Sequence, residues 1–224
     1  MALTGSIWHL IGAVVVFLGS HSLTNMKHVR APAQRLVGKR GFYVGYSVVS
    51  VLLLAWMIAA YADAPTVVLW AQAPWMRWAP PLAMLVAAPL GVVGLTSPNP
   101  FSIGPGGARF DAGRPGIVRL TRHPVVWALA LWSGAHIVPN GDAAALTMFV
   151  PLLGLALLGP RILDGRRRNA LGEAAWRHLA DTVAAVPLAN AIRQVGWSRP
   201  LAGLAVYALL LALHQPVIGV SPLP

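Results

Sequence analysis

The sequence has no cysteine, and only 10% of its 224 residues are charged. Without cysteine, neither disulfide bonds nor thiolate chemistry can contribute to structure or function. The low charge accompanies 57% hydrophobic residues and a mean hydropathy of +0.65, a composition well outside that of ordinary soluble domains. The composition therefore predicts a membrane protein.

Six apolar stretches are each long enough, or nearly so, to cross a hydrocarbon core of about 30 Å as a helix. They lie at residues 6–24, 42–62, 78–96, 124–139, 143–160 and 200–220. The first stretch has no basic segment before it and no small-residue cleavage pattern after it, so we expect a retained helix and not a signal peptide. The predicted fold is a single all-α transmembrane domain over residues 1–224, with about six spanning helices.

The net charge of +11 is confined almost entirely to one side of this predicted membrane topology. Except for Arg77, every lysine and arginine lies between the first and second, third and fourth, or fifth and sixth apolar stretches. By the positive-inside rule these segments face the cytoplasm, and both termini lie outside it. The basic residues are therefore expected to contact anionic membrane lipid and not nucleic acid.

Two of the basic segments have further features. Residues 96–120 are rich in proline and glycine, which prevents a regular helix. Their GPGG has no strand before it and no GKS/T pattern after it, so it is not a phosphate-binding loop of the usual kind. Residues 163–183 mix apolar side chains with a dense arginine patch, which is typical of an amphipathic helix on the membrane surface. A solvated basic loop is the alternative.

Three of the seven histidines lie inside apolar stretches, namely His21, His136 and His214. A polar side chain is costly there unless it has a partner, so each is a candidate functional residue. A hydrogen bond to a neighbouring helix is the alternative interpretation.

The neighbours of His136 on its own helical face include Trp132 and Ser133, and Gly134 lies close by. Small residues of this kind allow either the close packing of another helix or the approach of a flat macrocycle to the imidazole. His123 directly precedes Pro124 and is predicted to be the N-cap residue of the fourth helix. It lies thirteen residues before His136, which corresponds to about 20 Å of helical rise, so the two cannot share one ion.

Six short motifs are spread over nearly the whole chain: SHSL at 20–23, SPNPFSIG at 97–104, TRHP at 121–124, LWSGAH at 131–136, NGD at 140–142 and the LLG ending the fifth apolar stretch. Together they resemble the NnrU family of bacterial membrane proteins. This family is associated with denitrification, in which it is needed for active nitrite and nitric oxide reductases, so the resemblance implies a protein of the bacterial inner membrane. The family is also related to the 15-cis-zeta-carotene isomerases, membrane enzymes that hold haem b and need ferrous iron to isomerise a polyene.

In the isomerase two histidines ligate the haem, and the resemblance assigns these roles to His21 of SHSL and His136 of LWSGAH. It also implies that Trp132, Ser133 and Gly134 lie beside the macrocycle. The isomerase has a cysteine at the position of Ser133, proposed as an alternative ligand, so ligand switching of that kind is not expected in this chain.

Helix geometry leaves the second ligand open. A rise of 1.5 Å per residue places His136 about 18 Å, and His21 about 9 Å, from the cytoplasmic ends of their helices. His214 lies about 22 Å above Arg199 and so is closer to the level of His136. The motif favours His21 as the second haem ligand, and the arithmetic favours His214.

Haem gives neutral intramembrane histidines a chemical role, because an unprotonated imidazole offers a lone pair for axial ligation of iron. Two histidine ligands would saturate the iron and favour electron transfer or sensing. Binding of nitric oxide, or catalysis, would require one ligand to leave. The position within the membrane suits an apolar substrate such as a polyene.

Two alternatives come from other functional classes. RHP before a helix, together with the later segment GEAAWRHL, also resembles isoprenylcysteine carboxyl methyltransferases, which bind S-adenosylmethionine. Arg122, His123 and Glu173 would then be the cofactor contacts, although the adjacent acidic pair usual in that segment is missing. The other alternative is a non-catalytic assembly factor that binds haem or a partner reductase.

Overall fold

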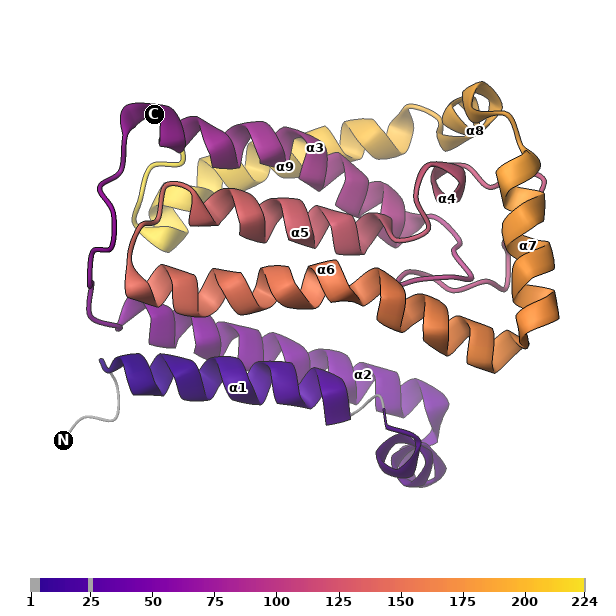
Figure 1. The fold of residues 1–224 in the computed structure, drawn as a ribbon, viewed down its shortest axis with the longest axis horizontal. Coiled ribbons are helices and arrows are strands. Elements are labelled where there is room, and N and C mark those ends of the chain that lie inside the picture. The colour runs from indigo at the N-terminus through magenta and orange to yellow at the C-terminus, as the bar shows by residue number, and fades with distance from the viewer. Residues whose placement is uncertain (1–4, 24–25, 224) are drawn as a thin grey trace. The chain divides into compact units, whose positions relative to one another are not determined.

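The computed structural model describes residues 5–23 and 26–223, and these residues are mostly helical (Figure 1). Within this described part, the β-structure consists of one isolated bridge between Val68 and Asp142. The predicted all-α class is confirmed. The helices are α1 Ile7–Leu23, α2 Lys27–Ala62, the short 3₁₀ helix η1 Pro74–Trp78, α3 Ala79–Thr96, α4 Ile117–Leu120, α5 Pro124–Ile137, α6 Ala143–Leu171, α7 Glu173–Ala185, α8 Leu188–Val195 and α9 Ser198–Ile218.

All six predicted apolar stretches are helical, in α1, α2, α3, α5, α6 and α9. In the described part of the chain, four helical segments are long and apolar enough to cross a membrane: α2, η1 with α3, α6 and α9. The apolar helices α1 and α5 are shorter, with 17 and 14 residues. The chain is therefore a multi-pass membrane protein.

Two helices continue well beyond their apolar stretches. α2 begins at Lys27 and contains a kink at Gly38, whose φ of 74° is in the left-handed region that favours glycine. α6 continues through the arginines 166–168 to Leu171, because arginine is a good helix former even where it is too polar for the membrane. Gly172, with a φ of 82°, then separates α6 from α7. The segment 163–183 is thus helical, as one of its two interpretations expected, but as parts of two helices.

The chain divides into two compact units, each described here by itself. Unit 1 contains the described residues of Met1–Ala71 together with Asn140–Pro151, and unit 2 those of Gln72–Pro139 together with Leu152–Pro224. In unit 1, α1 packs along α2, and the indole N–H of Trp56 donates a hydrogen bond of 2.9 Å to Nε2 of His9.

In unit 2, α3 packs against both α5 and α9, and glycines permit these close approaches. A Cβ atom added at Gly94 would lie 2.8 Å from Cγ of Pro124, at the start of α5. A Cβ atom at Gly203 of α9 would overlap Cα of Pro89 in α3. These two positions therefore require glycine for the helices to pack as they do.

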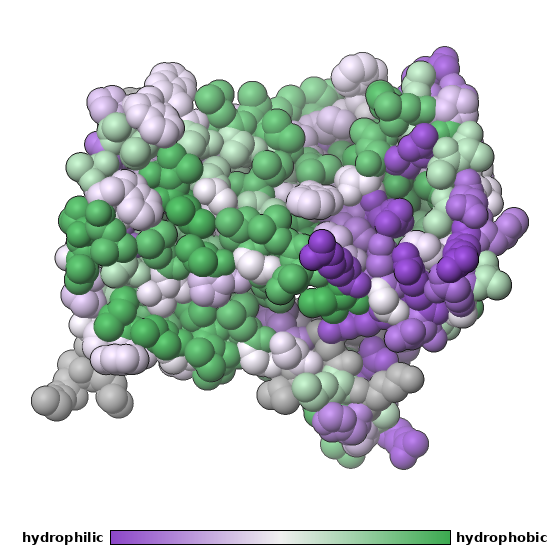
Figure 2. All heavy atoms as spheres, viewed as in Figure 1, coloured by the Kyte–Doolittle hydropathy of each residue, from purple (hydrophilic) through white to green (hydrophobic). Residues whose placement is uncertain are grey.

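One end of unit 2 is a folded polar cap. The irregular segment that follows α3, the short helix α4 and the helix α7 enclose an apolar cluster, and α4 also contacts α8. Figure 2 shows hydrophilic side chains gathered over the end where α7 and α8 lie in Figure 1. The proline- and glycine-rich segment is thus mostly irregular, as predicted, but well packed. The buried members of its cluster are Val93, Phe101, Ile117, Val118, Trp176 and Val183.

Candidate functional site

His136 lies near the end of α5 with its imidazole half-buried. Its Nδ1 is 2.7 Å from the carbonyl oxygen of Trp132, one helical turn earlier, and the Trp132 ring lies 5.7 Å away. A carbonyl oxygen only accepts hydrogen bonds, so Nδ1 carries the proton and the lone pair of the neutral ring is on Nε2. Anchoring one ring nitrogen in this way is the usual arrangement of a histidine that ligates a metal through the other.

His214 of α9 has the same arrangement, because its Nδ1 lies 2.7 Å from the carbonyl oxygen of Val220. Its imidazole is near enough to that of His136 for the two rings to interact electrostatically. Two candidate ligands, one from α5 and one from α9, are therefore neighbours in unit 2.

His21 belongs to unit 1, near the end of α1. Its Nδ1 is 2.9 Å from the carbonyl oxygen of Phe17, so this ring too holds its lone pair on Nε2. The rings of Phe17 and Tyr46 lie 4.5 and 5.7 Å from the imidazole. The structure thus gives His21 the chemistry of a ligand, and its pairing with His136 stays a prediction.

The small residues beside His136 take part in helix packing. Ser133 is fully buried, and its hydroxyl donates a 2.8 Å hydrogen bond to the carbonyl oxygen of Leu129. A Cβ atom at Gly134 would be 3.6 Å from Cδ1 of Leu153 in α6, an ordinary van der Waals distance. Close packing is thus observed for these residues, and a place beside a macrocycle stays a prediction.

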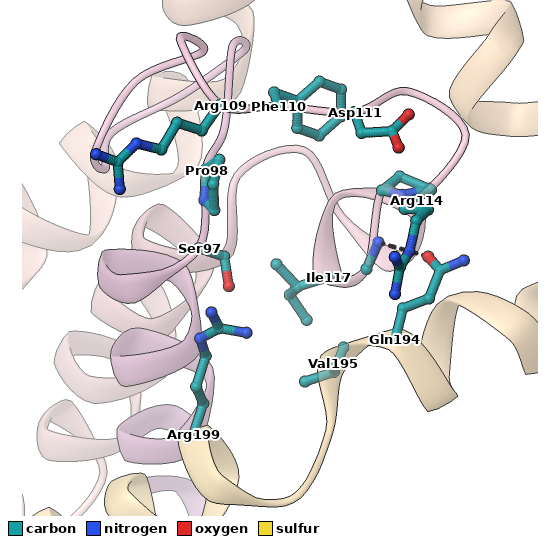
Figure 3. A pocket seen from close by; sticks show the side chains of 12 residues that line it. Ser97, Pro98, Arg109, Phe110, Asp111, Arg114, Ile117, Gln194, Val195 and Arg199 are labelled. Atoms are coloured by element: carbon teal, nitrogen blue, oxygen red, sulfur yellow. Dashed lines mark hydrogen bonds between the residues drawn. The ribbon is translucent and has the colours of Figure 1, made fainter.

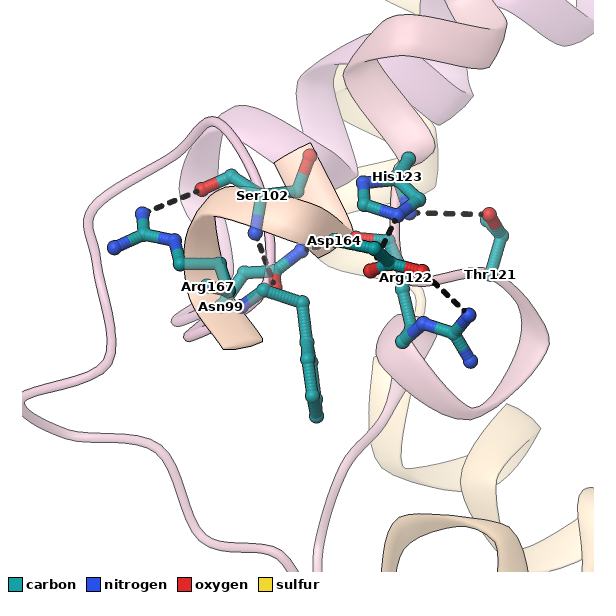
Figure 4. Close-up of polar contacts among 8 residues, drawn as sticks. Asn99, Ser102, Thr121, Arg122, His123, Asp164 and Arg167 are labelled. Atoms are coloured by element: carbon teal, nitrogen blue, oxygen red, sulfur yellow. Dashed lines mark hydrogen bonds and ion pairs between the residues drawn. The ribbon is translucent and has the colours of Figure 1, made fainter. Parts of the chain in front are cut away.

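The motifs SPNPFSIG and TRHP contact each other, and TRHP also contacts a carboxylate of α6 (Figure 4). Oδ1 of Asp164 is 3.1 Å from Nε2 of His123, and Oδ2 accepts a hydrogen bond of 2.9 Å from Nη2 of Arg122. We call this group the Asp164 cluster. Its members are Asn99, Ser102, Thr121, Arg122, His123, Asp164 and Arg167.

His123 is the N-cap residue of α5, as predicted, and Pro124 is the first residue of the helix. Its side chain makes no capping hydrogen bond and instead contacts Asp164. Burial lowers the pKa of the His123 imidazole below its ordinary value, and this effect outweighs the opposing influence of the Asp164 carboxylate. The neutral ring therefore donates from Nε2 to Asp164, and its Nδ1 lacks a hydrogen-bond partner among the described residues.

Asn99 joins the two motifs and is fully buried. Its Oδ1 accepts hydrogen bonds from the backbone N–H groups of Phe101 and Ser102, at 2.9 and 3.2 Å. Its Nδ2 donates to the carbonyl oxygen of Arg122, at 2.9 Å. One side chain thus fixes the loop after α3 against the residues that begin α5.

Two aromatic rings lie beside the guanidinium of Arg122 in the Asp164 cluster. The guanidinium of Arg122 lies 5.5 Å from the ring centre of Trp176 and 6.0 Å from that of Phe101. Arg168 lies 4.0 Å from the same Trp176 ring. Both distances to Trp176 fall within the range of cation–π attraction.

The residues considered for S-adenosylmethionine binding have different environments. Arg122 and His123 meet at Asp164, whereas Glu173 is exposed and pairs with Arg177, one turn further along α7, at 2.6 Å. Sequence reasoning missed Asp164 itself. Its only signal was a carboxylate inside a basic run directly after an apolar helix.

The described residues contain no group of three or more histidine, cysteine, aspartate or glutamate side chains placed to hold a bare metal ion. Haem iron does not need such a group, because the porphyrin supplies its in-plane ligands and the protein only the axial ones. Single anchored histidines such as His21, His136 and His214 therefore fit haem better than a protein-ligated metal centre.

The fold and these features define a helical multi-pass membrane protein with histidines inside its apolar helices and a partly buried ion-pair cluster at the polar end of unit 2. The chain belongs to the NnrU family, whose model, described as NnrU protein, matches residues 9–222. No curated protein and no solved structure is significantly similar to it.

Proposed function

We propose that this NnrU-family protein binds haem b in the bacterial inner membrane and supports the nitrite and nitric oxide reductases of denitrification. The observation that carries the proposal is the state of His136. This histidine lies in an apolar helix, its Nδ1 is fixed by the carbonyl oxygen of Trp132, and its lone pair is on Nε2. An intramembrane imidazole in this state is suited to be an axial ligand of haem iron.

The second axial ligand has two candidates, each supported by a different observation. His21 is favoured by the family motif, and its anchored Nδ1 gives it the same lone pair. His214 is favoured by its position, because it is an electrostatic neighbour of His136 within unit 2. When bound, haem would supply a redox-active iron that can bind nitric oxide or act on an apolar polyene.

We assign the Asp164 cluster a positioning role. His123 is the N-cap residue of α5, and His136 lies thirteen residues later, near the other end of this helix. The contacts of Asp164 with Arg122 and His123 hold this helix start to α6. By fixing the start of α5, these contacts also fix the position of His136 relative to α6.

The proposed topology has six membrane crossings with both termini outside the cytoplasm. In unit 2, the side chain of Arg77 donates a hydrogen bond to the carbonyl oxygen of Leu223. Leu223 and η1 thus lie at one end of this unit, while α7 and α8 lie at the other (Figure 1). The distance between Arg77 and the basic cap supports the proposed topology, because the positive-inside rule expects the basic segments to lie together on the cytoplasmic side.

The absorbance spectrum of the purified protein tests the proposal. A haem Soret band is expected in the protein isolated in mild detergent from cells supplied with haem precursor. A protein without the Soret band that binds S-adenosylmethionine would contradict the proposal and support the methyltransferase alternative.

A genetic experiment separates a haem-dependent role from a simple assembly role. A strain lacking this chain should lose nitrite and nitric oxide reductase activities, and wild-type protein should restore both. The variant His136→Ala should restore neither. Full restoration by this variant, at equal abundance in the membrane, would show that the chain supports the reductases without haem at His136.

A further inference from the structure

A cavity of about 300 Å³ in unit 2 is lined by three arginines (Figure 3). Arg109 and Arg114 come from the loop before α4, and Arg199 comes from the first turn of α9. In Figure 3 the guanidinium of Arg199 reaches toward Ser97, and that of Arg114 lies beside Gln194. We call this space the arginine cavity.

The arginine cavity has an excess of positive charge. Within the described residues, none of the guanidinium groups of Arg109, Arg114 and Arg199 has an ion-pair partner. Asp111 is the one acidic residue of the lining, and its Oδ1 accepts a hydrogen bond of 2.9 Å from the backbone N–H of Gly113. Unpaired guanidinium groups at a cavity favour an anion, and their planar fork matches the oxygens of a phosphate.

A second cavity, of about 380 Å³, adjoins the first and differs from it in chemistry. Ile117 and Val195 line both cavities. Apart from these two residues, its lining is mainly apolar and includes Leu90, Val93, Ile192, Trp197 and Pro200. We call this space the apolar cavity.

The one charged residue of the apolar cavity already has partners. The guanidinium of Arg193 donates to the side-chain oxygen of Asn190 and to the backbone carbonyl of Ala189. The interior of the apolar cavity therefore suits a hydrocarbon chain, whereas the arginine cavity beside it suits an anion.

Both cavities lie where two apolar helices end at the polar cap. Pro89 and Val93 belong to the last turns of α3, and Trp197 is the N-cap residue of α9. Trp197 is also 82% exposed, and tryptophan is enriched at the level of lipid headgroups. The pair of cavities is thus placed where a lipid headgroup and the start of its acyl chain would lie.

We propose that the two cavities together bind one anionic phospholipid, with its phosphate in the arginine cavity and an acyl chain in the apolar cavity. A free phosphate would use only the first space. A zwitterionic lipid would bring a cationic group toward three arginines. This site is independent of haem and extends the proposed function by a specific lipid requirement.

Native mass spectrometry of the detergent-purified full chain, titrated with phosphatidylglycerol or phosphatidylcholine, tests the proposal. The double variant Arg114→Gln/Arg199→Gln should bind phosphatidylglycerol at least about tenfold more weakly, because it removes two guanidinium groups that make charge-assisted hydrogen bonds with a phosphate. The control Arg35→Gln/Arg161→Gln removes the same charge from exposed positions outside both cavities. It should bind like the wild type.

Two further arms distinguish the source of the phosphate. The variant Ile192→Asp, in the apolar cavity, should also weaken phosphatidylglycerol binding, and inorganic phosphate at millimolar concentration should not displace the lipid. Equal binding by the double arginine variant and its control would overturn the proposal. Displacement by inorganic phosphate, or equal affinity for phosphatidylcholine, would overturn it as well. Circular dichroism of each variant confirms that the helices are retained.

Discussion

Replacing Asp164 with alanine should destabilise the polar end of unit 2 substantially. This substitution removes the acceptor for two donors at once, the imidazole of His123 and the guanidinium of Arg122. The two donors differ in exposure, because the His123 side chain is 5% exposed and the Arg122 side chain 40%. The free-energy cost of leaving each donor without its acceptor is therefore estimated separately.

The buried imidazole of His123 accounts for most of the expected destabilisation. Leaving its N–H group without an acceptor costs about 1–3 kcal/mol. The Arg122 pair is partly solvated, so its loss adds no more than about 1 kcal/mol. We therefore expect Asp164→Ala to lower the free energy of unfolding by about 1–4 kcal/mol.

The measurement is unfolding by sodium dodecyl sulfate in mixed micelles, followed by circular dichroism. The matched control is Glu173→Ala, which removes the exposed pair with Arg177. Its cost should be no more than about 0.5 kcal/mol, as for other exposed pairs one helical turn apart. A double-mutant cycle between Asp164 and His123 should give a coupling energy of at least about 1 kcal/mol.

Equal stabilities of Asp164→Ala and Glu173→Ala would refute this reasoning. So would additive effects in the double-mutant cycle, because they would show that His123 and Asp164 do not stabilise each other.

Two other perturbations have clear expected outcomes in the same assay. Gly203→Ala should lower the free energy of unfolding by about 1–3 kcal/mol, since the new Cβ would overlap Pro89. The control Gly154→Ala, which has open space around the new Cβ, should lower it by almost nothing. Similar effects of the two substitutions would contradict the close packing of α3 and α9. Because burial lowers the pKa of His123 below 6.5, the unfolded chain binds a proton that the folded chain does not. The free energy of unfolding should thus fall as the pH falls below about 6.5, by up to about 1.4 kcal/mol per pH unit from this group. The variant His123→Gln should show a smaller loss between about pH 7.5 and about pH 5.5, and an unchanged loss would contradict the assignment.

Hydropathy predicted where apolar helices lie better than where helices end. The starts of α3, α5 and α6 fall within one residue of the predicted apolar stretches, because a polar residue lies one or two positions before each of them. The continuation of α6 to Leu171 was not predicted, since hydropathy indicates which residues can lie in the membrane and not which residues are helical. Gly172, which ends this continuation with a positive φ, was a local signal that reasoning from hydropathy did not use.

The candidate site was predicted in part. The cap position of His123 could be deduced from the adjacent Pro124, because the preference of proline for the first turn is local. Its partner Asp164 lies 41 residues away in the sequence, and no local pattern connects the two. The role of Asn99 could not be predicted for the same reason. Two of its three hydrogen bonds are local, but the one that joins the motifs spans 23 residues.

The central claim, that His136 is an axial ligand of haem b, is tested most directly by the absorbance spectrum of His136→Ala. The matched control is His178→Ala, which replaces an exposed histidine of α7. The account predicts that the wild type and His178→Ala share one low-spin haem spectrum, while His136→Ala becomes high-spin or loses haem. The same spectra of His21→Ala and His214→Ala should identify the second ligand. Full haem content and an unchanged low-spin spectrum in His136→Ala would contradict the account.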